Sequence, residues 1–109
     1  MIELLKKYQK LFKLQDWEIE LIEEPTMDEI AHNFILYNDY KCVIRIRADL
    51  APEEKEKALI HELLHMIFRD AHDLFTENCD NEAIKLYCQR QHERAIEKTA
   101  KIIYSLVKQ

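Results

Sequence analysis

Two histidines four residues apart, with a glutamate directly after the first, are the residues of this chain best suited to chemistry. His61, Glu62 and His65 stand in the stretch LIHELLHMIF, which is otherwise apolar. On an α-helix, positions i and i+4 lie on one face about one turn apart, so both imidazoles can reach a single metal ion. Glu62 would lie beside that ion, where a carboxylate can accept a proton from bound water without being a ligand. The order His-Glu-x-x-His therefore predicts two zinc ligands and a general base within one helical turn.

The alternative interpretation is that these are ordinary polar residues of a packed helix. The apolar residues around the motif form a stripe of their own, namely Leu59, Ile60, Leu63, Leu64 and Ile67. His61, Glu62 and His65 fall on a different face, which must look into a cleft or into solvent. This placement favours a metal site over histidines that serve packing alone.

A catalytic zinc needs a third protein ligand and an open position for water, and the last part of the chain offers a candidate. Glu93 belongs to a seven-residue series with Leu86, Ala100 and Val107, so it is expected on the buried face of a helix. A carboxylate buried there needs a partner, and a zinc ion held by two histidines would provide one. Glu97, one turn further on, is the alternative ligand or an outer-sphere acceptor.

Other residues near the motif are weaker candidates for the third ligand. His72 follows His65 by seven residues, and a continuing helix would carry it about 10 Å along the axis, too far for the same ion. Asp70 and Asp73 are expected in a solvated loop. Glu93 and Glu97 also have a simpler interpretation, as exposed glutamates paired with Arg94 or Lys101.

The patterns around these residues predict a short series of elements. Helical spacing of apolar residues, period-two alternation and turn residues predict a helix over 2–14, a strand over 16–23, a hairpin over 32–47 that turns near Asn38 and Asp39, a helix over 52–68, a connecting loop over 69–81 and a last helix over 81–107. Pro52 and the glutamates behind it suit the first turn of the motif helix.

Composition limits the classes to which the protein can belong. The 109 residues are enough for one domain, 1–109, and the net charge of −5 comes without a basic cluster, which argues against a nucleic-acid partner. The complete lack of glycine disfavours phosphate-binding loops, dinucleotide fingerprints and nucleophile elbows. No apolar run is long enough to cross a membrane, and three cysteines without a CxxC motif suggest reduced thiols in a cytoplasmic protein.

Several stretches together resemble the zincin metallopeptidases of the gluzincin kind, in particular small ImmA/IrrE-like and phage-type members. The similarity rests on a W-x-I pattern near the start and on VIRIRADL, LIHELLHMI and HERAIEKTAKII. In such families a glutamate downstream of the motif is followed seven residues later by an alanine, as Glu93 is by Ala100. The family's asparagine, four residues after the ligand, is Glu97 here. The chain has no helix-turn-helix domain.

The resemblance implies an α+β minimal zincin-like domain with an N-terminal helix, a short three-stranded twisted sheet, the motif helix and a long C-terminal helix. It also implies zinc-dependent hydrolysis of peptide bonds through a metal-activated water, with Glu62 as base and His61, His65 and Glu93 as ligands. The alternative function is a non-catalytic, metal-stabilised regulatory or interaction module. A peptide or protein substrate could dock as an added strand along an exposed edge such as 41–47. Four tyrosines could stabilise an oxyanion, and none is singled out: Tyr37, Tyr40, Tyr87 and Tyr104.

Overall fold

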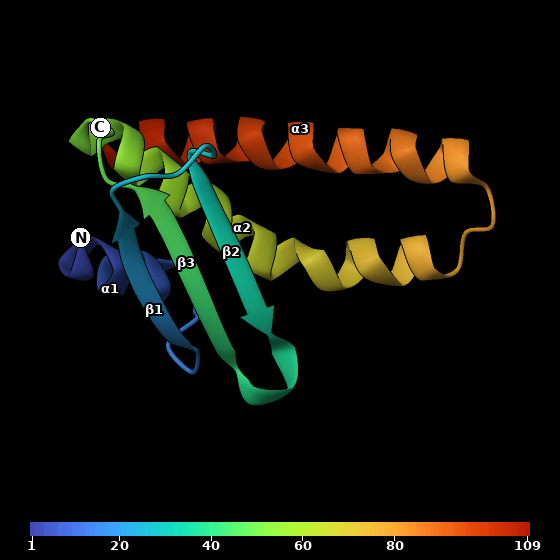
Figure 1. Ribbon diagram of the computed structural model, residues 1–109, viewed down its shortest axis with the longest axis horizontal. Helices are drawn as coiled ribbons and strands as arrows, with labels where there is room; N and C mark the ends of the chain where they lie inside the picture. The colour runs from blue at the N-terminus through green and yellow to red at the C-terminus, as the bar shows by residue number, and fades with distance from the viewer. The chain divides into compact units, whose positions relative to one another are not determined.

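The computed structural model describes the backbone of residues 1–109 and all side chains except those of Asp70, Ala71 and residues 73–75. The elements in chain order are α1 (Ile2–Leu11), β1 (Glu18–Glu24), β2 (Ala31–Leu36), a 3-10 turn (Tyr37–Asp39), β3 (Lys41–Arg47), α2 (Pro52–Glu77) and α3 (Glu82–Val107) (Figure 1). The predicted α+β class with a three-stranded sheet is therefore confirmed. The chain forms two compact units, Met1–Leu63 and Leu64–Gln109, and α2 runs through both. The single domain over 1–109 stays a prediction.

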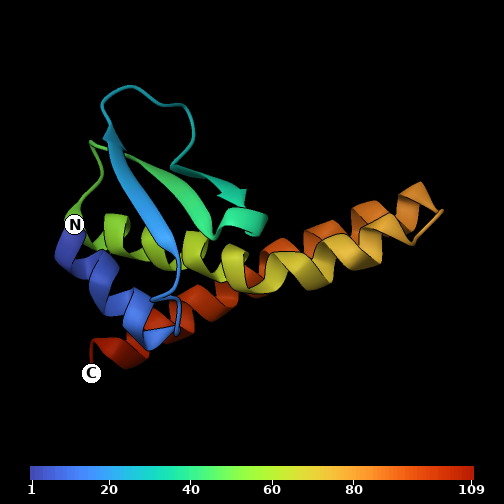
Figure 2. The same cartoon turned by 90° about the horizontal axis from the view of Figure 1, so that it is seen from below.

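The sheet of the first unit has the strand order β1-β3-β2. β3 pairs in parallel with β1 and antiparallel with β2, so the predicted hairpin is confirmed. The expectation that 41–47 is an exposed edge is wrong, because β3 is the central strand and β1 covers its second side. The alternation of β3 buries Cys42, Ile44 and Ile46 on the face where α1 and the first half of α2 lie (Figure 2).

Two turns of this unit use left-handed backbone without glycine. Tyr40 closes the 3-10 turn of the hairpin with a φ of 53°, one residue after the predicted turn at Asn38 and Asp39. Its ring packs edge-on against Trp17, with the ring centroids 5.5 Å apart. Lys13 has a φ of 57° just after α1, which ends at Leu11, before the predicted end at Leu14. Such backbone is unfavourable for a residue with a Cβ, so packing like that of Tyr40 on Trp17 must stabilise it.

The core of the first unit joins α1, β3 and α2. Its fully buried side chains include Tyr8, Ile44, Ile46, Leu59, Ile60 and Leu63. The Tyr8 hydroxyl donates a hydrogen bond to the Glu56 carboxylate, which is only 4% exposed, so a buried charge is matched by a donor from another helix. Nearer the surface, a hydrogen bond from Lys55 and its positive charge lower the pKa of the Glu23 carboxyl.

The second unit is a helical hairpin made by the second part of α2 and by α3, which run antiparallel (Figure 1). α2 extends past the predicted end at Phe68 to Glu77, so the loop predicted over 69–81 is wrong for most of its length. The chain has no glycine, and no proline follows Pro52, so nothing in this stretch breaks the helix. The connection is only 78–81, and the Asn81 side chain caps α3 by accepting a hydrogen bond of 3.1 Å from the Ile84 amide.

Candidate metal centre

The motif residues lie on α2, one helical turn from first to last. His61 and His65 are both partly buried, and the ring nitrogens that they offer as ligands lie within 4.8 Å of each other. The helix is continuous through both residues, since Pro52 starts it and the apolar residues Leu59, Ile60, Leu63 and Leu64 anchor this turn in buried positions. Of the predicted apolar stripe, only Ile67 is well exposed. The predicted pairing of two imidazoles on one turn is therefore present in the helix.

Glu62 is one of the few charged residues that the first unit buries. Its relative exposure is 7%, and its carboxylate accepts a hydrogen bond from the side-chain amide of Asn33 on β2. Asn33 faces α2 together with Ala31 and Ile35, whereas His32 and Phe34 face outward. The sequence reasoning missed Asn33. The signal that could have found it is a polar residue at an inward position of an alternating strand, because such a side chain needs a partner.

Glu93 lies against His65 within the second unit. Its carboxylate oxygen Oε2 is 3.4 Å from His65 Nε2. The side chain of Glu93 is nevertheless 50% exposed, so the predicted placement of Glu93 on a buried helix face is wrong. Leu86 of the same seven-residue series is also exposed, at 49%, while Ala100 and Ile96 are buried. The contact with His65, not burial, is what supports Glu93 as a candidate ligand.

Glu97, the alternative ligand, has a different partner. Its carboxylate lies 3.4 Å from Lys101 Nζ, one turn further along α3, and its side chain is 62% exposed. This is the simple helix-surface pair that the sequence offered as the alternative interpretation. The choice of third ligand stays a prediction, and these contacts favour Glu93.

A histidine on α3, His92, also packs on the motif. The His92 ring lies edge-on to His65, with ring centroids 5.7 Å apart, and it stacks on His72 at 4.2 Å with the planes 7° apart. His72 was set aside as a ligand, and its described contact is this stacking. His92 could not be singled out from the sequence, because its contacts cross from one helix to another. Asp70 and Asp73 lie outside the described side chains.

Of the four tyrosines considered as oxyanion donors, three make described ring contacts and Tyr87 is exposed. Tyr37 and Tyr40 both lie edge-on to Trp17, Tyr87 is 64% exposed, and Lys108 lies over the Tyr104 ring. These contacts of the rings do not single out any one of the four hydroxyls for a role with substrate.

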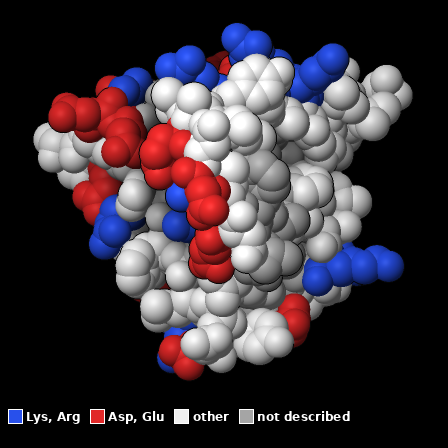
Figure 3. Space-filling model, turned by 90° about the vertical axis from the view of Figure 1, so that its right-hand side faces the viewer, with Lys and Arg blue, Asp and Glu red and all other residues white. Residues whose placement is uncertain are grey.

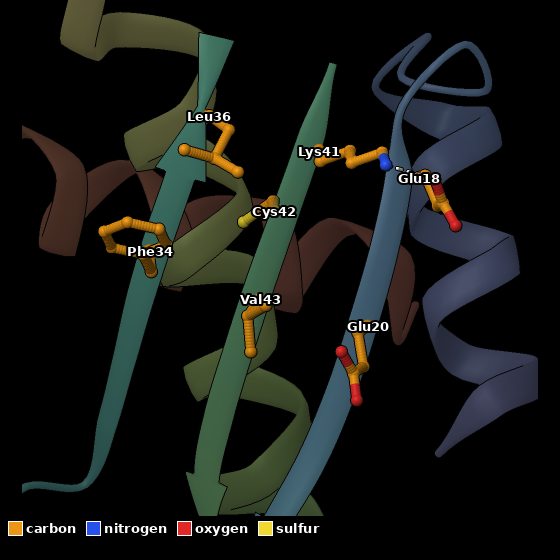
Figure 4. Close-up of a pocket in the computed structure, with 7 residues that line it drawn as sticks. All are labelled: Glu18, Glu20, Phe34, Leu36, Lys41, Cys42 and Val43. Carbon is orange, nitrogen blue, oxygen red and sulfur yellow. Dashed lines mark ion pairs between the residues drawn. The ribbon is translucent and has the colours of Figure 1, made fainter. Parts of the chain in front are cut away.

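A hollow of about 250 Å³ lies on the outward face of the sheet (Figure 4). Phe34 and Leu36 of β2, Val43 of β3 and two glutamates of β1 line it. Successive side chains of a strand point to opposite faces, so this hollow lies across the sheet from Asn33 and Glu62. It is not part of the candidate metal centre.

The charged side chains on one face of the protein can be followed in Figure 3. On the face drawn in Figure 3, acidic side chains gather in a strip, and lysines and arginines lie both beside it and nearer the edge of the view. The chain carries 16 basic and 21 acidic residues in total. Among the described residues, no helix is long and apolar enough to cross a membrane.

The donor types fit a zinc ion. Imidazole nitrogens from one helical turn and a carboxylate in contact with one of the rings are the ligands that catalytic zinc sites combine. Calcium and magnesium prefer oxygen ligands, so the two imidazole nitrogens disfavour a site for either of these ions.

Comparison with known proteins gives one match. No curated protein and no solved structure matches the chain significantly. The family model of the IrrE N-terminal-like domain, Peptidase_M78, matches residues 15–101, from just before β1 to well inside α3. The match includes the whole of α2 with its His-Glu-x-x-His motif and most of α3 with Glu93. The predicted resemblance to ImmA/IrrE-like zincins is confirmed, and the chain belongs to the M78 peptidase family of IrrE N-terminal-like domains.

Proposed function

We propose that the protein is a zinc-dependent metallopeptidase, with His61, His65 and Glu93 as ligands and Glu62 as the general base. The observation that carries the proposal is the buried Glu62 carboxylate, oriented by Asn33 and flanked in the helix by two potential imidazole ligands. The contact between Glu93 and His65 supports the third ligand. Membership of a peptidase family supports the reaction class.

Each of these residues has a distinct task in the proposed reaction. A bound zinc ion would lower the pKa of its water and polarise the carbonyl of the scissile peptide bond. Glu62 takes the proton of the attacking water and then delivers it to the leaving amine, which requires a carboxylate within hydrogen-bond reach of both. His61 and His65 bind through neutral imidazole nitrogens, so the helix must hold both rings toward one point. Glu93 supplies a negative charge that offsets part of the charge of the ion.

The proposed substrate is a peptide segment in extended conformation, bound along β2. The Arg47 amide donates to the carbonyl of Ile30, which precedes β2, and these two residues continue the register by one step beyond the pair of Ala31 and Ile46. Hydrogen-bonded and non-hydrogen-bonded pairs alternate in an antiparallel ladder, so the backbone groups of Ala31, Asn33 and Ile35 point away from β3. Among the described strands, none pairs with that edge. A peptide could add there as a further strand and would lie next to the strand whose side chains face Glu62.

The competing function is a metal-stabilised interaction module without catalysis. A structural zinc site has four protein ligands and no use for a base beside them. A buried glutamate that is aligned by a neighbouring amide is therefore better explained by hydrolysis.

The decisive test is the substitution Glu62→Gln. Glutamine keeps the shape of the side chain but cannot accept a proton at neutral pH, whereas the proposed ligands are unchanged. We expect zinc content equal to that of the wild type and a loss of peptide hydrolysis of about a hundred- to ten-thousand-fold.

A peptide library incubated with both proteins at matched zinc occupancy would give the comparison, with a chelator-treated sample as blank. Glu53→Gln, at an exposed position in the first turn of the same helix, is the matched control and should cleave as the wild type does. Equal cleavage by Glu62→Gln would exclude Glu62 as base. No cleavage by the zinc-loaded wild type would favour the interaction module.

A further inference from the structure

Asn33 combines two features that no other residue of β2 combines in this way. Its side-chain Nδ2 donates a hydrogen bond to Glu62 Oε2, across the 28 residues that separate them in the chain. Its backbone N–H and C=O belong to the non-hydrogen-bonded positions of the β2–β3 ladder, so they point to the open edge of the sheet. The side chain of Asn33 therefore contacts the proposed base, and its backbone lies at the edge of β2 where the peptide is proposed to bind.

We propose that Asn33 is a positioning residue that fixes the orientation of the Glu62 carboxylate and links it to a peptide on β2. This inference rests on the proposed function. It goes further because it assigns the orientation of the base to a residue outside the His-Glu-x-x-His motif.

The chemistry of the two groups supports this role. A glutamate side chain has three rotatable bonds, and a base must hold its acceptor oxygen in place before the reaction begins. The Asn33 amide binds one named oxygen of the carboxylate, Oε2, and so restricts the rotation of the carboxylate plane. An amide cannot take up a proton, so Asn33 orients the carboxylate without competing as a base. A strand paired to a central neighbour is a rigid platform for this donor.

The hydrogen bond can be tested without any activity. In metal-free protein labelled with ¹⁵N, the Asn33 side-chain amide is identified as the pair of signals missing from Asn33→Asp. The neutral acceptor in Glu62→Gln weakens the hydrogen bond, so we expect the bonded Nδ2 proton to shift upfield. The control His32→Gln, at the neighbouring outward position, should leave these signals in place. Asn33 signals that do not respond to Glu62→Gln would overturn the proposal.

Kinetics on zinc-loaded protein then separates positioning from mere support of the fold. We expect Asn33→Ala to lower kcat about 10- to 100-fold, as loss of an orienting partner does elsewhere, with KM and zinc affinity unchanged. Asn33→Gln keeps an amide donor on a longer arm and should recover part of kcat, whereas Asn33→Asp should not. In the Glu62→Gln background, Asn33→Ala should have no further effect, because Asn33 acts through Glu62.

The outcomes distinguish this inference from the proposed function. A wild type that hydrolyses peptides, together with an equally fast Asn33→Ala variant, overturns the positioning role alone. The positioning role would also be overturned if Asn33→Ala lowered kcat by the same factor in the Glu62→Gln background as in the wild type. Such a result would show that the two residues act independently. A zinc-loaded wild type without hydrolysis overturns the proposed function and this role with it, while the amide signals still decide whether the hydrogen bond exists.

Discussion

At the residue scale, contacts rather than burial distinguish the two glutamates that could complete the metal centre. Glu93 and Glu97 are both largely exposed, with side-chain exposures of 50% and 62%. Glu93 Oε2 lies 3.4 Å from His65, whereas Glu97 is paired with Lys101. An exposed pair on one helix is worth little energy, so the Glu97 carboxylate gains little from its present contact. Leaving Lys101 to bind a metal ion would therefore cost Glu97 little energy.

We predict that Glu93→Ala weakens zinc binding more than tenfold and that Glu97→Ala changes it by less than about threefold. The first substitution removes a proposed ligand, and the second removes a surface pair. Equilibrium titration with a competing chelator, under the same conditions, measures the zinc affinity of each variant. A stronger effect of Glu97→Ala would assign the third ligand to Glu97 instead.

The residues of the candidate site differ in how far the sequence could predict them. His61, Glu62 and His65 were predictable because helical spacing alone brings them onto one turn. Glu93 was predicted from a burial argument that is wrong, although the contact with His65 exists. Asn33 leaves a local signal, a polar residue at an inward strand position, but that signal does not name Glu62 as its partner. His92 makes its contacts across two helices, and such long-range pairing leaves no local pattern in one sequence.

At the element scale, the strand order decides where a peptide can bind. The sequence predicted the hairpin correctly. It could not reveal that β3 also pairs with β1, which makes β3 the central strand. The edge strands are therefore β1 and β2, and β2, whose Asn33 contacts Glu62, presents the backbone groups of Ala31, Asn33 and Ile35 at its open side. The end of α2 was also difficult to predict from the sequence. The helix continues to Glu77 through a polar stretch that resembles a loop, because no glycine or proline is present there to end it.

We predict that Ile35→Pro raises the KM for a peptide about 2- to 10-fold while the fold remains intact. Proline removes the N–H that points to the open edge, and an edge strand tolerates it because no bond to β3 is lost. Ile35→Ala controls for the lost side chain. Phe34→Pro, which removes a donor to β3, should instead destabilise the protein in urea. An unchanged KM for Ile35→Pro would argue against strand addition at this edge.

The contact between α1 and α2 makes a separate prediction about stability. Tyr8→Phe removes the hydroxyl that donates to the buried Glu56 carboxylate, so we expect a loss of about 1 to 3 kcal/mol in the free energy of unfolding. Glu56→Gln keeps an acceptor for Tyr8 and removes the buried charge, so it should cost less. Urea denaturation of both variants at neutral pH gives the comparison. A larger loss for Glu56→Gln would show that the charge itself stabilises the core.

At the scale of the whole molecule, the question is whether one ion stabilises the chain as a single cooperative unit. The chain has 109 residues and forms two compact units that share α2, while the sequence predicts one domain. A domain of this size buries a modest core, so a metal that binds only the folded state makes a large difference to its stability. Binding at a free zinc concentration of about 100 times Kd would add about 2.7 kcal/mol.

We therefore predict that the purified protein binds a single zinc ion per chain and that zinc raises its Tm by on the order of 10 °C. Elemental analysis after purification without chelator measures the content, and calorimetry of chelator-treated and reloaded samples measures the shift. His61→Ala and His65→Ala should lose the shift, because each removes a proposed ligand. Glu62→Gln should keep it, because the base does not bind the ion. A metal-free protein that is fully folded, with the same Tm when zinc is added, would contradict the zinc site, and a shift in only part of the transition would contradict the single domain.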